Sequence, residues 1–223
     1  MLEQKLRWSR KDQEILVLSN TYVAYEATLP PEQQLKDVSL ARIGQVLVDA
    51  NVARQAISDS EATRVKEGAI FRTTLGQVRD ALRQARRVLG ARYLDDVSPL
   101  VDWGFTVVIS RGKPAVRLPN VQPGWLNLMQ AYLAREGALE EGERVVRPGY
   151  DEVQGLWQTL QESLKARDEA LARRETAVEA RKAAVKRLLA LLKLAAETRV
   201  QLYYGGQVSP ELQLWGYDVL GIE

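Results

Sequence analysis

The stretch from Tyr150 to Tyr204 reads YDEVQGLWQTLQESLKARDEALARRETAVEARKAAVKRLLALLKLAAETRVQLYY and contains no proline. It is rich in Ala, Leu, Glu, Gln, Lys and Arg, which favour a helix, whereas a proline in a helix interior costs about 3 kcal/mol. Every seventh residue from Trp157 to Leu192 is apolar, which is the spacing of a coiled-coil seam. The stretch therefore predicts one helix about 80 Å long, at about 1.5 Å per residue, and such a helix needs equally long partners.

A companion row of seven-residue steps turns from apolar to basic in mid-helix. The apolar row is Trp157, Leu164, Leu171, Val178, Val185 and Leu192, and the companion row is Val153, Leu160, Arg167, Arg174, Arg181, Leu188, Ala195 and Leu202. Because burying an unpaired charge is costly, the middle of this helix is expected either to be solvated or to pair its arginines with carboxylates of a neighbouring subunit. Arg167, Arg174 and Arg181 are therefore candidate interface residues.

A second proline-free stretch, residues 32–98, is the obvious partner of this helix. Its apolar residues keep a three-four spacing from Ile43 to Leu89, so we expect a long helix that starts near Val38. The pattern Ser58-x-x-Glu61 has the form of a capping box and allows a break in that helix.

A shorter helix is expected before each long one, from about Lys11 to Leu29 and from about Pro123 to Glu136. Between the halves, residues 105–118 contain two short runs of β-forming residues around Arg-Gly-Lys-Pro. This pattern fits either a hairpin or an extended linker.

Two similar phrases close the two long stretches. The first is YLDDVSPLVDWGF from Tyr93, and the second is YYGGQVSPELQLWGY from Tyr203. Their Val-Ser-Pro segments match residue for residue 111 positions apart, and a Trp-Gly pair follows in both. The sequence therefore predicts two tandem helical repeats, residues 1–110 and 123–223, with a junction at residues 111–122. The expected fold is all-α, an elongated antiparallel bundle built from these repeats, with a small β-hairpin as one alternative at the junction.

The repeated phrase has the form of a helix end followed by a new helix start. Gly205-Gly206 suits a left-handed helix end, and Ser209-Pro210-Glu211 supplies an N-cap, a first-turn proline and an acidic residue. The aromatic residues that follow either fold over the end of their own bundle or dock on a partner, because such residues dominate both cores and interfaces. These candidate interface residues are Trp103, Phe105, Trp215 and Tyr217.

The phrase Tyr-Gly-Gly-Gln-Val-Ser-Pro-Glu-Leu, residues 204–212, resembles helix ends of uncharacterised bacterial helical proteins with tandem units of about this size. In those proteins an aromatic-Gly-aromatic run follows, as it does here, and residues 93–105 carry a degraded copy. This chain has one residue more than their spacing. The resemblance covers only the two tips and part of each preceding helix, and it implies an architecture without any activity, catalytic residue or cofactor.

The composition removes most enzyme chemistry. The 223 residues include neither histidine nor cysteine, which excludes Ser-His-Asp variants, thiolate nucleophiles and the commonest ligands of transition metals. The adjacent acidic pairs Asp95-Asp96, Glu140-Glu141 and Asp151-Glu152 lack the spacing of a calcium loop, and no phosphate-binding glycine motif occurs. We therefore expect no enzyme activity, no catalytic residue, no metal site and no cofactor.

Basic residues cluster on both long helices. The clusters are Arg79, Arg83, Arg86, Arg87 and Arg92 on the first, and Arg173, Arg174, Arg181, Lys182, Lys186 and Arg187 on the second. Such stripes fit a phosphate backbone, but acidic residues interleave at the spacing of ordinary ion pairs, and the net charge is only +2. A nucleic-acid-binding helical module is therefore the alternative function.

The favoured function is a non-enzymatic structural or interaction protein that assembles with itself, as a homo-oligomer or filament, through its long helices and tryptophan-bearing tips. The sequence contains no signal-peptide pattern and no apolar stretch of about 20 residues that could span a membrane. No membrane partner is expected, and the expected location is the cytoplasm.

Overall fold

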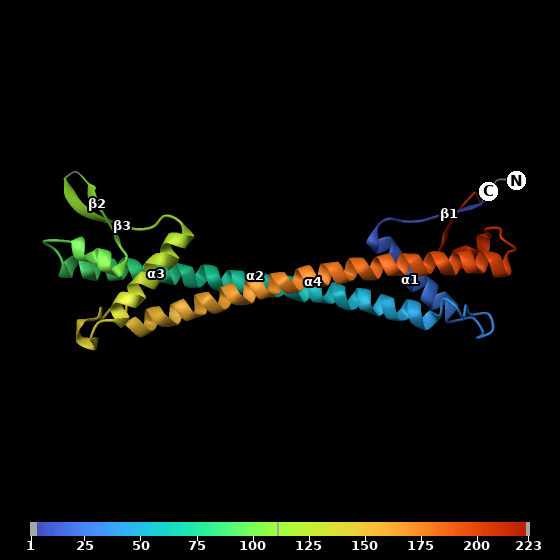
Figure 1. Cartoon of the computed structure of the whole chain (residues 1–223), viewed down its shortest axis with the longest axis horizontal. Coiled ribbons are helices and arrows are strands. Elements are labelled where there is room, and N and C mark those ends of the chain that lie inside the picture. The colour runs from blue at the N-terminus through green and yellow to red at the C-terminus, as the bar shows by residue number, and fades with distance from the viewer. Residues whose placement is uncertain (1–3, 111, 222–223) are drawn as a thin grey trace. The chain divides into compact units, whose positions relative to one another are not determined.

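The computed structural model of this chain describes residues 4–110 and 112–221, so Arg111 of the predicted junction lies outside the described residues. It is mostly helical, at 71%, with long helices that pack against each other and two small antiparallel strand pairs (Figure 1). An all-α bundle is therefore the correct fold class. The chain divides into two compact units.

Unit 1 comprises Met1–Glu61 and Leu171–Glu223. Its helices are α1 (Asp12–Glu26), the first part of α2 (Leu40–Arg92) and the last part of α4 (Tyr150–Tyr203). It also contains a 3₁₀ helix, η3 (Pro210–Trp215), and two strands, β1 (Lys5–Arg7) and β4 (Asp218–Leu220), which pair antiparallel with Leu6 opposite Val219.

Unit 2 comprises Ala62–Ala170 and contains the same kinds of element. The last part of α2 packs with the first part of α4 and with α3 (Gln122–Gly137). Two 3₁₀ helices, η1 (Ser98–Trp103) and η2 (Glu141–Glu143), and two strands, β2 (Thr106–Ser110) and β3 (Lys113–Arg117), complete it. These strands form an antiparallel hairpin, so the hairpin alternative at the junction is confirmed.

The two compact units do not coincide with the consecutive segments 1–110 and 123–223 expected from the sequence. Each unit combines the start of one segment with the end of the other, because α2 and α4 are each long enough to contribute to both units. A continuous helix cannot fold back on itself, so each part of α2 buries its apolar face against the antiparallel part of α4. The spacing of apolar residues indicates that a face is buried but does not identify what covers it.

The helix boundaries follow the sequence closely, with one alternative resolved. Helix α2 runs without interruption from Leu40 to Arg92, so the capping-box pattern at Ser58 does not break it. Helix α1 ends at Glu26, three residues before the expected Leu29, because residues 27 and 28 already form a turn.

The predicted seven-residue row of α4 does not stay buried along the helix. Leu171 of the apolar row is 43% exposed and Leu202 of the companion row is 68% exposed, whereas Ala170 and Ala177 are buried. Further along the same row Val185 and Leu192 are buried, so the row leaves the buried face in mid-helix and returns to it. Small residues take over where the row leaves that face.

Each unit has its own apolar core. In unit 1, α1 and the tip η3 pack on α2 and α4 around Tyr22, Ile43, Leu188, Leu192 and Leu212. In unit 2, α3 and the tip η1 pack on α2 and α4 around Leu82, Leu89, Leu100, Met129 and Tyr132. The tips therefore close the cores rather than extend from them.

Candidate functional site

Both tips are short 3₁₀ helices that end on a left-handed glycine. Ser209 caps η3, since its hydroxyl accepts a hydrogen bond from the Glu211 amide. Gly104 and Gly216 follow the two helices with φ of 83° and 85°. The expected stop and restart of the chain is therefore correct at Ser209-Pro210-Glu211.

In unit 2, the tip is held by a buried glutamate on α3. Trp103 is 1% exposed, and its Nε1 donates a hydrogen bond to Glu136 Oε1 at 2.6 Å. The second oxygen of Glu136 accepts a hydrogen bond from the Val145 amide at 2.8 Å. This carboxylate therefore joins the tip, the short helix and the loop that leads to α4.

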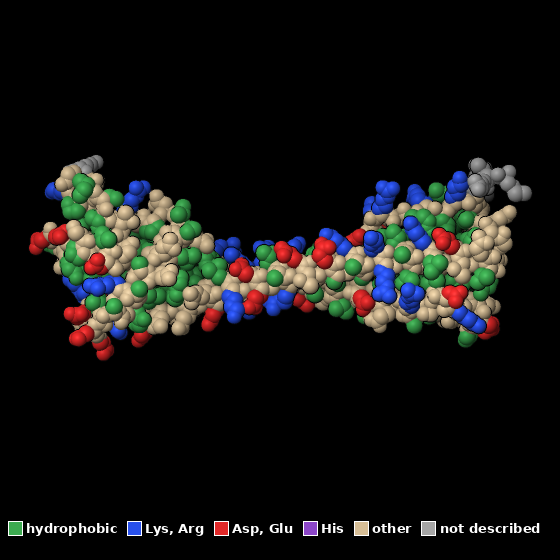
Figure 2. Space-filling model, in the orientation of Figure 1, with side chains coloured by type: hydrophobic (Ala, Val, Ile, Leu, Met, Phe, Trp, Pro, Cys, Tyr) green, Lys and Arg blue, Asp and Glu red, His purple; other side chains and the backbone are tan. Residues whose placement is uncertain are grey.

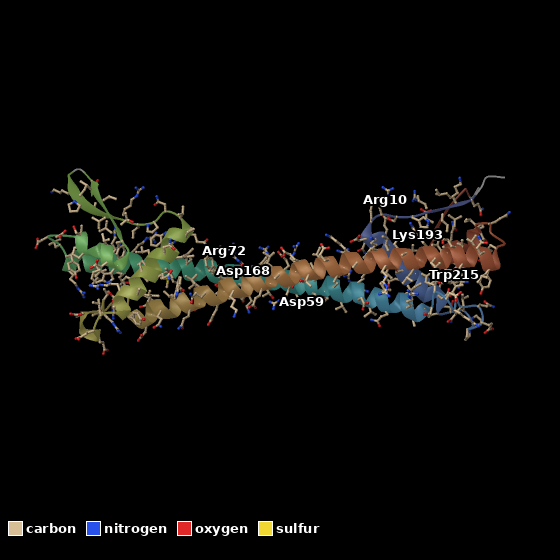
Figure 3. The ribbon with its side chains drawn as sticks, in the orientation of Figure 1. Arg10, Asp59, Arg72, Asp168, Lys193 and Trp215 are labelled. Carbon is tan, nitrogen blue, oxygen red and sulfur yellow. The ribbon has the colours of Figure 1, made fainter. Side chains whose placement is uncertain are left out.

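In unit 1, Glu26 on α1 makes the corresponding contacts and also has a cation beside it. Trp215 Nε1 donates to Glu26 Oε2 at 2.7 Å, and the Leu35 amide donates to Oε1 at 2.8 Å. Arg199 of α4 is buried, forms an ion pair with Glu26, and lies 4.2 Å above the Trp215 ring (Trp215 is labelled in Figure 3). The paired charges make this buried site less costly than a lone carboxylate.

The remaining aromatic candidates of the tips are also buried. The hydroxyl of Tyr217 donates to the Leu192 carbonyl at 2.8 Å, and its ring meets Trp8 edge to face. Burial raises the pKa of Tyr217 and of Tyr132, the latter also because of the neighbouring Glu136 charge. Phe105 is buried in the core of unit 2. A partner would contact these rings only after a tip is displaced.

Glu26 and Glu136 are site residues that sequence reasoning missed. Each is a single acidic residue on an amphipathic helix, where a solvated carboxylate is the ordinary interpretation. A signal was present, because Tyr22 and Glu26 recur as Tyr132 and Glu136 at a distance of 110 positions. The sequence comparison matched Trp103 with Trp215, but it did not include Glu136 and Glu26, which accept their hydrogen bonds.

Two of the three interface arginines pair with carboxylates of their own chain. Arg174 Nε lies 3.7 Å from Glu61 Oε2, and Arg181 Nη2 lies 3.5 Å from Asp12 Oδ2. Arg167 is placed differently, with its guanidinium 5.8 Å from the centre of the Phe71 ring. The sequence pattern brings these arginines to one helix but does not gather them into one site.

The basic cluster of α2 is largely engaged within unit 2. Arg79 and Arg83 lie over the ring of Trp125, at 5.8 and 5.6 Å from its centre. Arg92 donates a hydrogen bond to the Glu143 carbonyl at 2.8 Å. Three of the five basic residues of this cluster therefore make contacts within unit 2.

The β2–β3 hairpin presents an apolar strand to solvent. Strand β2 reads TVVIS and carries no charge, and its Ile109 is 74% exposed. Strand β3 contains Lys113, Pro114 and Arg117, residue types that protect a sheet edge. Hydrophobic side chains are visible at the hairpin in the space-filling view (Figure 2).

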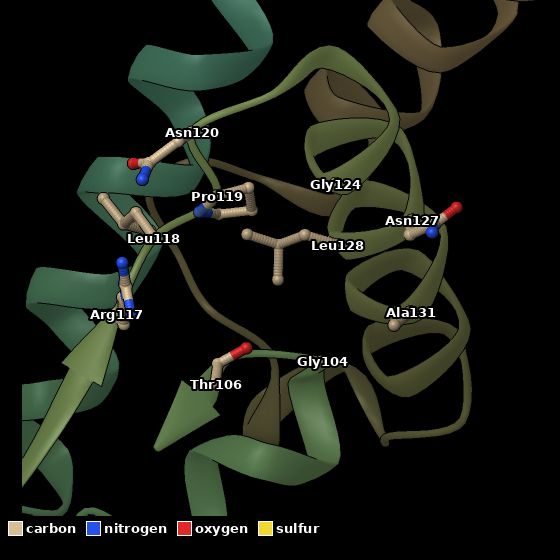
Figure 4. Close-up of a pocket in the computed structure, with 10 residues that line it drawn as sticks. All are labelled: Gly104, Thr106, Arg117, Leu118, Pro119, Asn120, Gly124, Asn127, Leu128 and Ala131. Carbon is tan, nitrogen blue, oxygen red and sulfur yellow. The ribbon is translucent and has the colours of Figure 1, made fainter. Parts of the chain in front are cut away.

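A pocket of about 560 Å³ lies between the hairpin and α3 (Figure 4). Its polar side chains are Thr106, Arg117, Asn120 and Asn127, and apolar residues such as Pro119 and Leu128 complete the lining. These groups include no nucleophile with a neighbouring base, so the pocket offers binding rather than acid-base chemistry.

Comparisons with protein-family models, curated proteins and solved structures give no match to this chain. Within the described residues, no group of three or more acidic side chains is placed to hold a metal ion. No helix in this part of the chain is both long and apolar enough to cross a membrane. The resemblance of the tip phrases to bacterial tandem-repeat proteins stays a prediction.

Proposed function

We propose that this chain is a non-enzymatic structural protein of the cytoplasm that forms a homodimer through the open edge of β2. The observation that carries the proposal is the uncharged strand TVVIS, which has one partner strand among the described residues and contains the exposed Ile109. An unprotected edge of this kind is a template for pairing with another chain.

The register of the hairpin indicates which backbone groups are open. Ile109 lies opposite Pro114, which has no amide hydrogen to donate. Opposed pairs alternate between hydrogen-bonded and non-hydrogen-bonded, so Val108 bonds to β3 while Val107 and Ile109 direct their amides and carbonyls outward. Two copies of β2 could therefore pair antiparallel and form a four-stranded sheet.

A dimer is favoured over a filament because the two strand pairs differ. In unit 1, β1 and β4 are three residues each and are joined by an ion pair between Arg7 and Asp218 at 2.6 Å. Charges and short length protect this pair. Within the described residues, one strand per chain has an uncharged open edge, and a single self-complementary surface closes as a two-fold dimer.

The proposal includes an origin of the chain by tandem duplication. The Glu26 and Glu136 contacts support it, because each glutamate binds a tip tryptophan and the amide nine residues downstream. The strand pairs agree with it as well, since β1 precedes α1 as β3 precedes α3, and β4 follows η3 as β2 follows η1.

Replacement of Ile109 by proline tests the proposed dimer. Ile109→Pro removes an outward amide hydrogen and leaves the Val108 bonds to β3 in place, so we expect a monomer with unchanged helix content. Leu94→Lys is the matched control, because Leu94 is a similarly exposed apolar residue outside the strand. Light scattering that finds the same mass for the original chain and Ile109→Pro would argue against this edge.

Nucleic-acid binding is less well supported as the alternative function. Several basic residues of the predicted stripes contact aromatic rings, carbonyls or carboxylates of their own unit. Binding to mixed DNA or RNA that weakens steeply with salt would restore it.

A further inference from the structure

A groove of about 700 Å³ in unit 2 is lined by arginines from two helices. Helix α2 contributes Arg64, Arg72 and Arg79, and α4 contributes Arg167, while Gln122 marks the start of α3. None of the described residues that line this groove is Asp or Glu. The groove is therefore strongly positive for its size.

Unit 1 has a carboxylate at the position that corresponds to Gln122 of the groove. Asp12 begins α1 as Gln122 begins α3, and it pairs with Arg181 at 3.5 Å. The residues at the corresponding positions of unit 2, 110 positions away, are Gln122 and Phe71, which cannot form an ion pair. Gln122 therefore supplies no negative charge at the position where Asp12 supplies one in unit 1.

Three of the groove arginines, Arg72, Arg79 and Arg167, have few anionic partners among the described residues. Among the ion pairs of residues 4–110 and 112–221, none involves Arg72 or Arg79. Arg167 has only its exposed neighbour Asp168, at 3.8 Å. Because arginine presents a rigid fork of donors that matches phosphate and carboxylate oxygens, such residues are suited to bind an anion from solution.

We propose that this groove binds a small phosphorylated molecule with two or more phosphate groups on an apolar or ring-bearing body, of the nucleoside di- or triphosphate class. Arg72 and Arg79 are about 10 Å apart along α2, so they would bind different phosphate groups or different parts of one ligand. Val65 and Leu75 provide an apolar wall for the body, and the volume lies within the usual range of about 300–1,000 Å³ for small-molecule sites.

A compact ligand fits better than a nucleic-acid strand. Proteins that bind single strands stack bases on accessible aromatic rings. The aromatic rings beside these arginines, Phe71 and Trp125, are both buried. Beyond the groove on α2, Arg83 pairs with Asp80 and Arg92 donates to a carbonyl, so these two arginines are already engaged within unit 2.

Calorimetric titration of the full chain with ATP and with inorganic pyrophosphate tests the proposal. We expect one site per chain, with pyrophosphate weaker than ATP because it lacks a body to cover Val65 and Leu75. Arg72→Gln should weaken ATP binding about tenfold, the usual effect of one charge-assisted hydrogen bond. Arg87→Gln, another exposed arginine of α2 outside the groove, should leave the affinity unchanged.

Two further variants exclude a folding defect as the cause of lost binding. Gln122→Asp copies the acid of unit 1, and an aspartate in the first turn of α3 is favourable to the helix. Gly68→Leu fills the groove, and a Cβ at this position has no other atom within 4 Å. Both should abolish ATP binding without lowering the melting temperature.

The proposal is overturned if ATP gives no binding heat, if Arg72→Gln and Gln122→Asp bind ATP like the original chain, or if only a single-stranded oligonucleotide binds. Ile109→Pro should retain ATP binding, because the groove and the β2 edge share no residue. Failure of the dimer and failure of the groove are therefore separate results.

Discussion

At the residue scale, two buried glutamates organise the ends of the helices. Glu26 and Glu136 each accept hydrogen bonds from an indole and from a loop amide, and both are fully buried. They differ in charge balance, because Arg199 pairs with Glu26 while Glu136 has no cationic partner within the described part of the chain. The two glutamates therefore lie in different electrostatic environments.

Replacement of each glutamate by glutamine should separate these environments. Glu26→Gln leaves Arg199 buried without its counter-charge, and breaking a buried pair in this way costs about 3–5 kcal/mol. Glu136→Gln leaves no cation without a counter-charge and weakens two hydrogen bonds, so we expect the free energy of unfolding to fall by about 1–2 kcal/mol. Urea unfolding measures both, and equal losses would contradict the charge assignment.

At the element scale, the sequence predicts the helices well because their determinants are local. Proline at positions 30 and 31 limits α1, the long proline-free stretches become α2 and α4, and Ser209-Pro210 restarts the chain at η3. What the sequence does not predict also has a physical reason, because it depends on contacts between distant parts of the chain. The spacing of apolar residues in α4 indicates an apolar face but does not show that Leu171 is exposed. A single glutamate at position 26 likewise does not show that a tryptophan far away in the sequence will donate a hydrogen bond to it.

The close contact between each tip and its short helix depends on glycine. A Cβ on Gly104 would lie 2.5 Å from the Ala131 Cβ, and φ of 83° is unfavourable for other residues. Gly104→Ala should therefore destabilise unit 2 by at least about 1–2 kcal/mol, from strain and lost packing.

The matched control for this substitution is Gly68→Ala in the middle of α2, where nothing lies within 4 Å of the added methyl group. Alanine should stabilise the helix there by about 0.5–1 kcal/mol. Thermal unfolding compares the two variants, and a Gly104→Ala protein as stable as the original chain would rule out tight packing at the tip.

At the scale of the whole molecule, each unit is built from the start of one proposed repeat and the end of the other. Residues Lys5 and Leu220 are opposite each other in the β1–β4 pair, as Lys113 and Ser110 are in the hairpin. The chain could therefore be cut at the hairpin turn and joined at its ends without changing either unit.

A circular permutant tests this arrangement. Its termini would be joined by a short glycine-rich linker, and its new ends would lie between Ser110 and Lys113. We expect the helix content of the original chain, because every strand pair and both glutamate contacts are retained. A permutant that fails to fold would contradict the proposed equivalence of the two strand pairs.

Self-association through β2 can be measured by sedimentation equilibrium over a range of protein concentrations. We expect a mass of twice 25.1 kDa for the original chain at the higher concentrations, and 25.1 kDa for Ile109→Pro throughout. A mass of 25.1 kDa for the original chain at every concentration would contradict it.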